Sequence, residues 1–86
     1  MESNSKWRPH PLDIGRTYLA IESFQGTPNA RFVRGSRYVL RAVDYSHFDS
    51  MTIFSFASVD DGARVQWWWF DNDPETQCKE RFEAAA

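Results

Sequence analysis

The chain has 86 residues, which is the length of one small domain. Four Trp, seven Phe and three Tyr supply enough large side chains for a dense core, and the single Cys78 excludes an intrachain disulfide. A net charge of −2 disfavours a nucleic-acid-binding protein, and no apolar run is long enough for a signal peptide or a membrane span, so a cytoplasmic protein is expected.

The charges are distributed unevenly along the chain. Residues 1–41 carry seven basic and three acidic side chains, whereas residues 42–86 carry three basic and nine acidic ones. The two halves therefore have net charges of +4 and −6. This asymmetry is explained either by complementarity between the packed halves or by a bipolar surface that favours self-association or a charged partner.

Residues 1–11 are predicted to form a flexible N-terminal arm, and residues 12–83 a single β-rich domain. The arm ends in Pro9-His10-Pro11, which favours extended backbone, and Trp7 is its one residue expected to dock. The terminal residues 84–86, all Ala, are interpreted as a tail or a remnant of cloning.

Two strands are predicted in the first half, at 16–22 and 37–43, where β-branched and aromatic residues resist a helical interpretation. Between them, Gly, Pro and Asn indicate a loop at 25–29, and residues 31–33 form a short strand that ends before Gly35.

A hairpin is the clearest local signal. Its strands are expected at 51–58 and 63–70, after a loop at 44–50. Asp61-Gly62 between them is typical of a two-residue type I′ turn.

A C-terminal helix is predicted over residues 74–83. Asp73 is expected to cap it, Pro74 suits its first position, and Glu75 complements the helix dipole. Cys78 and Phe82, four residues apart, would lie on its apolar face.

The two-residue turn would divide the three consecutive tryptophans between the faces of the hairpin, because alternate strand residues point to opposite sides. It would pair Phe56 with Trp67 and Phe54 with Trp69 on the core face. The opposite face would carry Ile53, Ser55, Ala57, Gln66, Trp68 and Phe70. If strand 37–43 joins the hairpin, Tyr38, Leu40 and Ala42 enter the core, and Arg37, Val39, Arg41 and Val43 lie outside.

Two interpretations of the outer face remain open. Either the C-terminal helix covers it, or it is a groove for a partner, with Trp68 and Phe70 as central contacts. The predicted binding residues are Trp68, Phe70, Ile53, Arg37 and Arg41.

Motifs for catalysis are absent from the sequence. It contains no nucleophile motif, phosphate-binding Gly loop or metal-ligand spacing, and His10 and His47 lack a third ligand nearby in sequence. We therefore expect no enzymatic activity, no catalytic residues, no metal and no cofactor.

Several short motifs together resemble a family of bacterial proteins. They are Leu12-x-x-Gly15-x-x-Tyr18, Phe24, Gly35-x-x-Tyr38, the loop Tyr45-Ser-His-Phe-Asp49, and a Trp-rich strand after an acidic turn. Over about residues 12–82 this order is similar to the domain-of-unknown-function 3601 family. Loop 25–30 departs from it, since it lacks an acidic stretch. The resemblance implies a compact, mainly β bacterial protein and assigns no activity or site.

The predicted fold is mainly β: a small, strongly bent antiparallel sheet or SH3-like partly open barrel of about five strands, with one C-terminal helix. The alternative is an α+β sheet with the helix flat on one face. The predicted function is a non-enzymatic binding or adaptor module for another protein, or for self-association. The alternative is a binder of single-stranded nucleic acid or a small ligand that uses Trp68 and the arginines.

Overall fold

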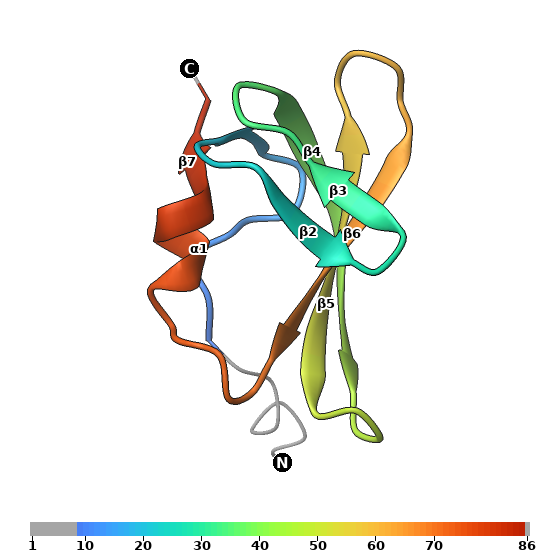
Figure 1. Cartoon of the computed structure of the whole chain (residues 1–86), viewed down its shortest axis with the longest axis vertical. Coiled ribbons are helices and arrows are strands. Elements are labelled where there is room, and N and C mark those ends of the chain that lie inside the picture. Colours follow the sequence, from blue (N-terminus) through green and yellow to red (C-terminus); the bar gives the residue numbers. More distant parts are fainter. Residues whose placement is uncertain (1–8, 86) are drawn as a thin grey trace.

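The computed structural model describes residues 9–85, which form a five-stranded antiparallel sheet, a two-stranded sheet and one short helix (Figure 1). The prediction of a mainly β domain with a C-terminal helix is confirmed. In chain order the elements are β1 (Thr17–Ala20), β2 (Phe24–Thr27), β3 (Ala30–Phe32), β4 (Arg37–Ser46), β5 (Met51–Ser58), β6 (Arg64–Phe70), α1 (Gln77–Arg81) and β7 (Phe82–Ala84).

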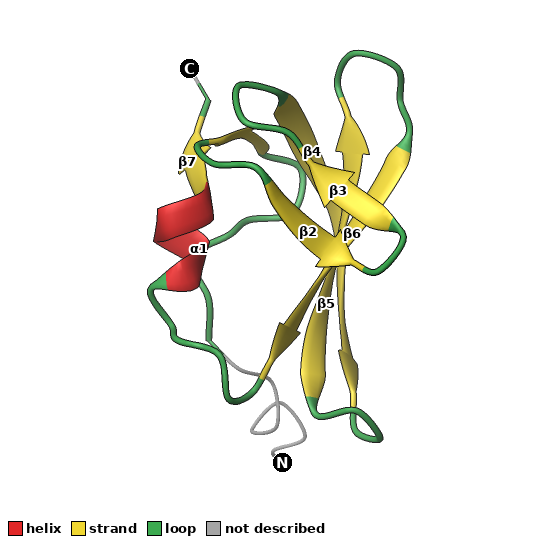
Figure 2. Cartoon of the chain, in the orientation of Figure 1, coloured by secondary structure: helices red, strands yellow, loops and turns green. Residues whose placement is uncertain are grey.

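The strand order of the large sheet is β6-β5-β4-β1-β7. Its edge strands, β6 and β7, do not pair with each other, so the sheet does not close into a barrel over residues 9–85. The β2–β3 hairpin lies between β1 and β4 in the sequence and folds across the sheet beside β6 (Figure 2). Within the same residues, no helix has the length and apolar character needed to cross a bilayer.

The core lies between the large sheet, the β2–β3 hairpin and α1. Trp67 and Trp69 are almost completely buried there, as predicted, because they share one side of β6. Their rings pack against Phe54 of β5, and Phe24 brings the small sheet into contact with Trp67. Ring-to-ring packing of this kind links all the layers of the domain.

The β5–β6 register differs from the predicted one by two residues. Phe54 pairs with Trp67, and Phe56 with Val65. The two-residue turn was therefore wrong. The loop spans residues 59–62, because the Ser58 N–H donates to the Ala63 carbonyl at 2.8 Å, and Gly62 within it adopts a left-handed φ of 73°. A shift by an even number leaves every side chain on its predicted face.

A β-bulge in β4 corrects part of the predicted outer face. The pairing shifts between Leu40 and Ala42, which leaves Arg41 as the extra residue. Beyond the bulge the faces exchange. Val43 is then opposite Phe54 and packs against the core, whereas Ala42 is opposite Ser55 on the outer side.

The helix prediction was wrong in its bounds and its cap. The helix has five residues and begins after Thr76, and the Asp73 carboxylate accepts the Phe70 N–H at 3.0 Å instead of capping the helix. Phe82–Ala84 is a strand because it pairs with β1, where Ala20 is opposite Phe82. Ala84 and Ala85 therefore belong to the fold, and the Ala85 N–H donates to the Thr17 carbonyl at 3.0 Å.

The end of the predicted arm contacts the domain. His10 is half-buried and packs edge-on against Phe54, with ring centroids 5.0 Å apart, and its Nδ1 accepts the Leu12 N–H. Leu12 is part of the core. Residues 1–8, including Trp7, and Ala86 lie outside the described residues.

Candidate binding face

The helix lies on the core side of the sheet (Figure 2). Trp68 projects from the other side of β6, because it alternates with the buried Trp67 and Trp69. Cys78 of α1 is fully buried in the core, and Phe82, which follows the helix, packs against Trp67. The Trp69 indole Nε1 donates to the Pro74 carbonyl at 3.3 Å, which ties the segment before the helix to the same side. Of the two interpretations left open, the one in which the C-terminal helix covers the outer face was therefore wrong.

The outer face is the side of β4–β6 opposite the core. Register and alternation place the following residues on it: Val39, Ala42, Asp44, Ile53, Ser55, Ala57, Arg64, Gln66, Trp68 and Phe70, with Arg41 added by the bulge.

Three of the five predicted binding residues come together on this face. Trp68 is directly opposite Ile53, and Phe70 is the next outward residue of β6. Trp68 is half-buried, and Phe70 is 42% exposed. Together with Ile53 they form an apolar patch at one edge of the sheet.

The two predicted arginines lie on the same face of the sheet but away from this patch. Arg37 is the first residue of β4. Asp44, which pairs with Ile53 and so lies level with Trp68, is near the other end of that strand. Arg41 lines a cavity of about 750 Å³ together with Arg64 of β6, above a floor that includes Ser55 and Ala57. We call this the basic cavity.

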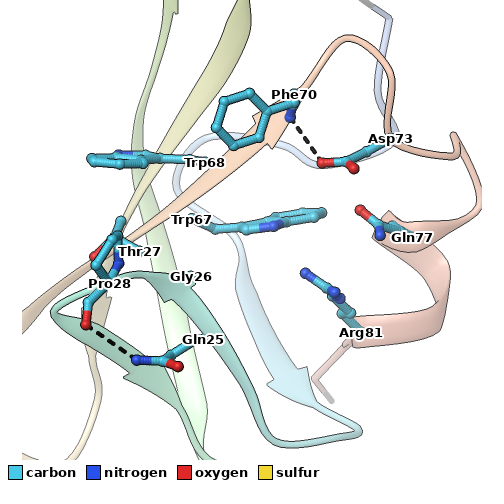
Figure 3. Close-up of a pocket in the computed structure, with 10 residues that line it drawn as sticks. All are labelled: Gln25, Gly26, Thr27, Pro28, Trp67, Trp68, Phe70, Asp73, Gln77 and Arg81. Atoms are coloured by element: carbon cyan, nitrogen blue, oxygen red, sulfur yellow. Dashed lines mark hydrogen bonds between the residues drawn. The ribbon is translucent and has the colours of Figure 1, made fainter. Parts of the chain in front are cut away.

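A second hollow, of about 450 Å³, lies along the free side of β6 (Figure 3). Trp67 and Trp68 project from β6 in opposite directions. The β2–β3 turn at Thr27 and Pro28 lies on the Trp68 side, and Gln77 and Arg81 of the helical segment lie on the Trp67 side. We call this the edge cleft.

The edge cleft and the basic cavity are both lined by residues of β6. A smaller hollow between them is lined by Thr27, which also lines the edge cleft, and by Ser55, Arg64 and Gln66, which also line the basic cavity. We call the three hollows together the β6 groove, and the β6 residues that line them extend from Phe70 to Arg64.

The backbone of β6 contributes to the groove. The Ser58 N–H donates to the Ala63 carbonyl and the Asp71 N–H to the Ser50 carbonyl. These two bonds fix which residues of β6 direct their backbone N–H and C=O groups toward β5. The backbone N–H and C=O groups of the even-numbered residues 64–70 then point away from β5. Those of Phe70 bond to Asp73, and those of Trp68 face the edge cleft.

Gly26 sets how closely the small sheet approaches this edge. A Cβ atom at this position would overlap the carbonyl oxygen of Gln66 and the ring of Phe32. Only glycine allows the β2 backbone to lie against β6 here, so Gly26 fixes the wall of the groove that Thr27 and Pro28 form.

The charges differ between the two ends of the groove. At the edge cleft, the Arg81 guanidinium lies 4.3 Å from the centroid of the Phe24 ring and 3.5 Å from a Glu22 carboxylate oxygen. In the basic cavity, Arg41 and Arg64 are exposed and form no ion pair with any residue of 9–85. Asp44 also lines this cavity, so its two arginines and one carboxylate leave a net positive charge at this end.

The edge cleft also has a polar atom that can accept a hydrogen bond. The side-chain Oε1 of Gln77 is buried and has no hydrogen-bond partner among residues 9–85. Gln77 lines the cleft beside Trp67, so a donor placed there could satisfy it.

Some residues of the groove were not predicted. Arg64 has the same parity as Trp68 and Phe70, so the alternation of β6 could have placed it on this face. Thr27, Pro28 and Gln77 reach the groove through tertiary packing, for which the sequence has no local signal.

Comparisons with known proteins establish the fold and no more. No protein-family model matches the chain, and no curated protein matches it. Among solved structures it is similar to an integron cassette protein from the mobile metagenome of Vibrio cholerae, with a TM-score of 0.68, 19% identity and 86% of each chain covered. At this identity the likeness shows a shared fold alone. The resemblance to the 3601 family stays a prediction.

Proposed function

We propose that this protein is a non-enzymatic binding module, and that its partner is another protein held in the β6 groove. The observation that carries the proposal is the position of Trp68 on the open face of the sheet. Trp67 and Trp69 already fill the core, so the fold does not require a third tryptophan at position 68.

The composition of the groove supports a protein partner. Trp and Arg are the residues most enriched at interaction hot spots, and the groove contains Trp68, Arg41 and Arg64. The outward backbone groups at Trp68 allow a partner chain to bond to the sheet edge, as in strand addition. Close approach of the Gly26 backbone to Gln66 limits that pairing to the segment around Trp68.

The cellular setting is part of the same proposal. We place the module in the cytoplasm of a bacterium, where the buried thiol of Cys78 stays reduced. Its SH3-like character and its membership of the 3601 family are likewise proposals.

Site-specific photocrosslinking in the cells that make the protein tests the function. A crosslinking amino acid replaces Gln66, which is exposed in the middle of the groove, and a control places it at Glu83, which is exposed on β7 at the opposite edge. We expect discrete protein adducts from position 66 that the control lacks and that Trp68→Ala abolishes.

The same adducts from both positions, or none from position 66, would refute the proposal. Adducts of twice the chain mass that contain only this protein would instead assign the groove to self-association.

A further inference from the structure

The basic cavity is lined by two arginines and one carboxylate, that of Asp44, and neither arginine forms an ion pair with a residue of 9–85. Arg41 is the extra residue of the β4 bulge, which turns its side chain to the outer face, and Arg64 begins β6 on the other side of β5. Small residues, Ser55 and Ala57, form the floor between them. The cavity is therefore suited to an anionic group that two guanidinium groups contact from both sides.

The apolar and basic ends of the groove are separated along one strand. Trp68 and Arg64 are four residues apart in β6, which corresponds to about 14 Å at the strand rise of roughly 3.4 Å per residue. An extended peptide laid along β6 covers the same distance in about four residues. Its side chains at positions i and i+4 point to the same side, so both can face the sheet.

We propose that the β6 groove recognises an extended acidic segment of the partner. An apolar side chain of the segment packs on Trp68, and a carboxylate about four residues away binds between Arg41 and Arg64. This inference rests on the proposed function and specifies the chemistry of its partner.

The charges around the groove favour a peptide over single-stranded nucleic acid. A nucleic-acid strand carries a phosphate at every step, and Asp44 lies in the row of Trp68 and Ile53, while Asp73 lines the edge cleft. Both carboxylates would repel a continuous phosphate backbone. A peptide with one carboxylate at the arginine end meets only Asp44 there, and the two arginines outweigh that charge.

Selection from a display library of random linear peptides tests the inference. The purified full-length protein is immobilised in three forms: unchanged, with Arg64→Glu, and with the control Arg34→Glu. Arg34 is exposed in the turn after β3 and does not line the groove, so the control makes the same charge change elsewhere.

We expect the unchanged protein and the control to select peptides with Asp or Glu about four residues from an apolar side chain. Arg64→Glu should lose these peptides. For one selected peptide, neutral Arg41→Gln or Arg64→Gln should each weaken binding about fivefold, the upper range for one exposed ion pair. Trp68→Ala should weaken it by tenfold or more.

Neutral or basic selected peptides, unaffected binding by Arg64→Glu, or no selected peptide at all would overturn the inference. Tighter binding of an oligothymidine strand than of any selected peptide, with a steep loss in salt, would assign the groove to nucleic acid instead. If one of the first three results is obtained but a protein still crosslinks at position 66, the inference of an acidic segment fails and the proposed function stands. Failure of the inference can therefore be told apart from failure of the proposed function.

Discussion

The adjacent residues Trp67 and Trp68 should respond very differently to the same substitution. Trp67 is 1% exposed, and its ring stacks on Phe54 at 5.2 Å and contacts Phe24 and Phe82 at 5.9 and 5.7 Å. Trp67→Ala removes these contacts and leaves a large cavity, which costs about 3–5 kcal/mol. A chain of this length has a free energy of unfolding of about 4–13 kcal/mol, so the variant loses a large part of its stability or does not fold.

Trp68→Ala should cost far less, about 1 kcal/mol, because its ring is half-buried on the outer face and water can reach the site. Urea denaturation followed by far-UV circular dichroism gives both values without relying on tryptophan fluorescence. Equal losses for the two variants, or a larger loss for Trp68→Ala, would refute the assignment of the two rings to opposite faces.

Substitutions at three further positions test other contacts. Gly26→Ala should lower the free energy of unfolding by about 1–3 kcal/mol, because the added methyl overlaps the Gln66 carbonyl. Unchanged urea denaturation would show that the β2–β3 hairpin does not lie against β6. Asp73→Ala should lower the free energy of unfolding by about 1 kcal/mol, because the Phe70 N–H loses its acceptor, and Asp73→Asn should lower it less. A drop in helix content without this loss of stability would restore Asp73 as a helix cap. Burial lowers the pKa of His10 below its ordinary 6.5, so the unfolded chain binds this proton more readily than the folded one. The stability that neutral His10 contributes should be complete above about pH 6.5 and should fall as the pH drops through the folded-state pKa. His10→Gln should make the melting temperature depend less on pH in this range. An unchanged pH dependence of the melting temperature would contradict the buried placement of His10.

The division of β6 into two faces was predictable because it depends only on alternation. Trp67 and Trp69 were assigned to the core from a turn that proved wrong, and the assignment survived because the register shift was even. The bulge at Arg41 could not be predicted in this way, since it depends on how β4 meets β5. It moved Ala42 and Val43 to the faces opposite to those predicted.

The C-terminal segment shows where local signals are insufficient. Asp73, Pro74 and Glu75 have the composition of a helix start, yet the Asp73 side chain bonds back to Phe70 at the end of β6. Phe82 has no strand signal of its own and becomes part of β7 because β1 offers an unpaired edge. Strand pairing with β1 therefore shortened the helix at its C-terminal end, and the local bond between Asp73 and Phe70 replaced the predicted cap at its start.

The candidate site was predicted in part for the same reasons. Trp68, Ile53 and Phe70 came together because all three follow from the hairpin pattern. Arg37 did not join them, because its distance from Trp68 depends on the true register of β4 with β5. The wall formed by Thr27 depends on the close approach of Gly26 to Gln66, which only the folded structure reveals.

The claim that Trp68 serves binding instead of folding is tested most directly by calorimetric titration of the partner crosslinked at position 66. The titration compares the unchanged protein with Trp68→Ala, after urea denaturation has shown that the variant is folded. We expect the variant to remain folded and to bind at least about 30-fold more weakly, equivalent to about 2 kcal/mol at an interaction hot spot. Equal affinity of the two proteins for that partner would contradict the account.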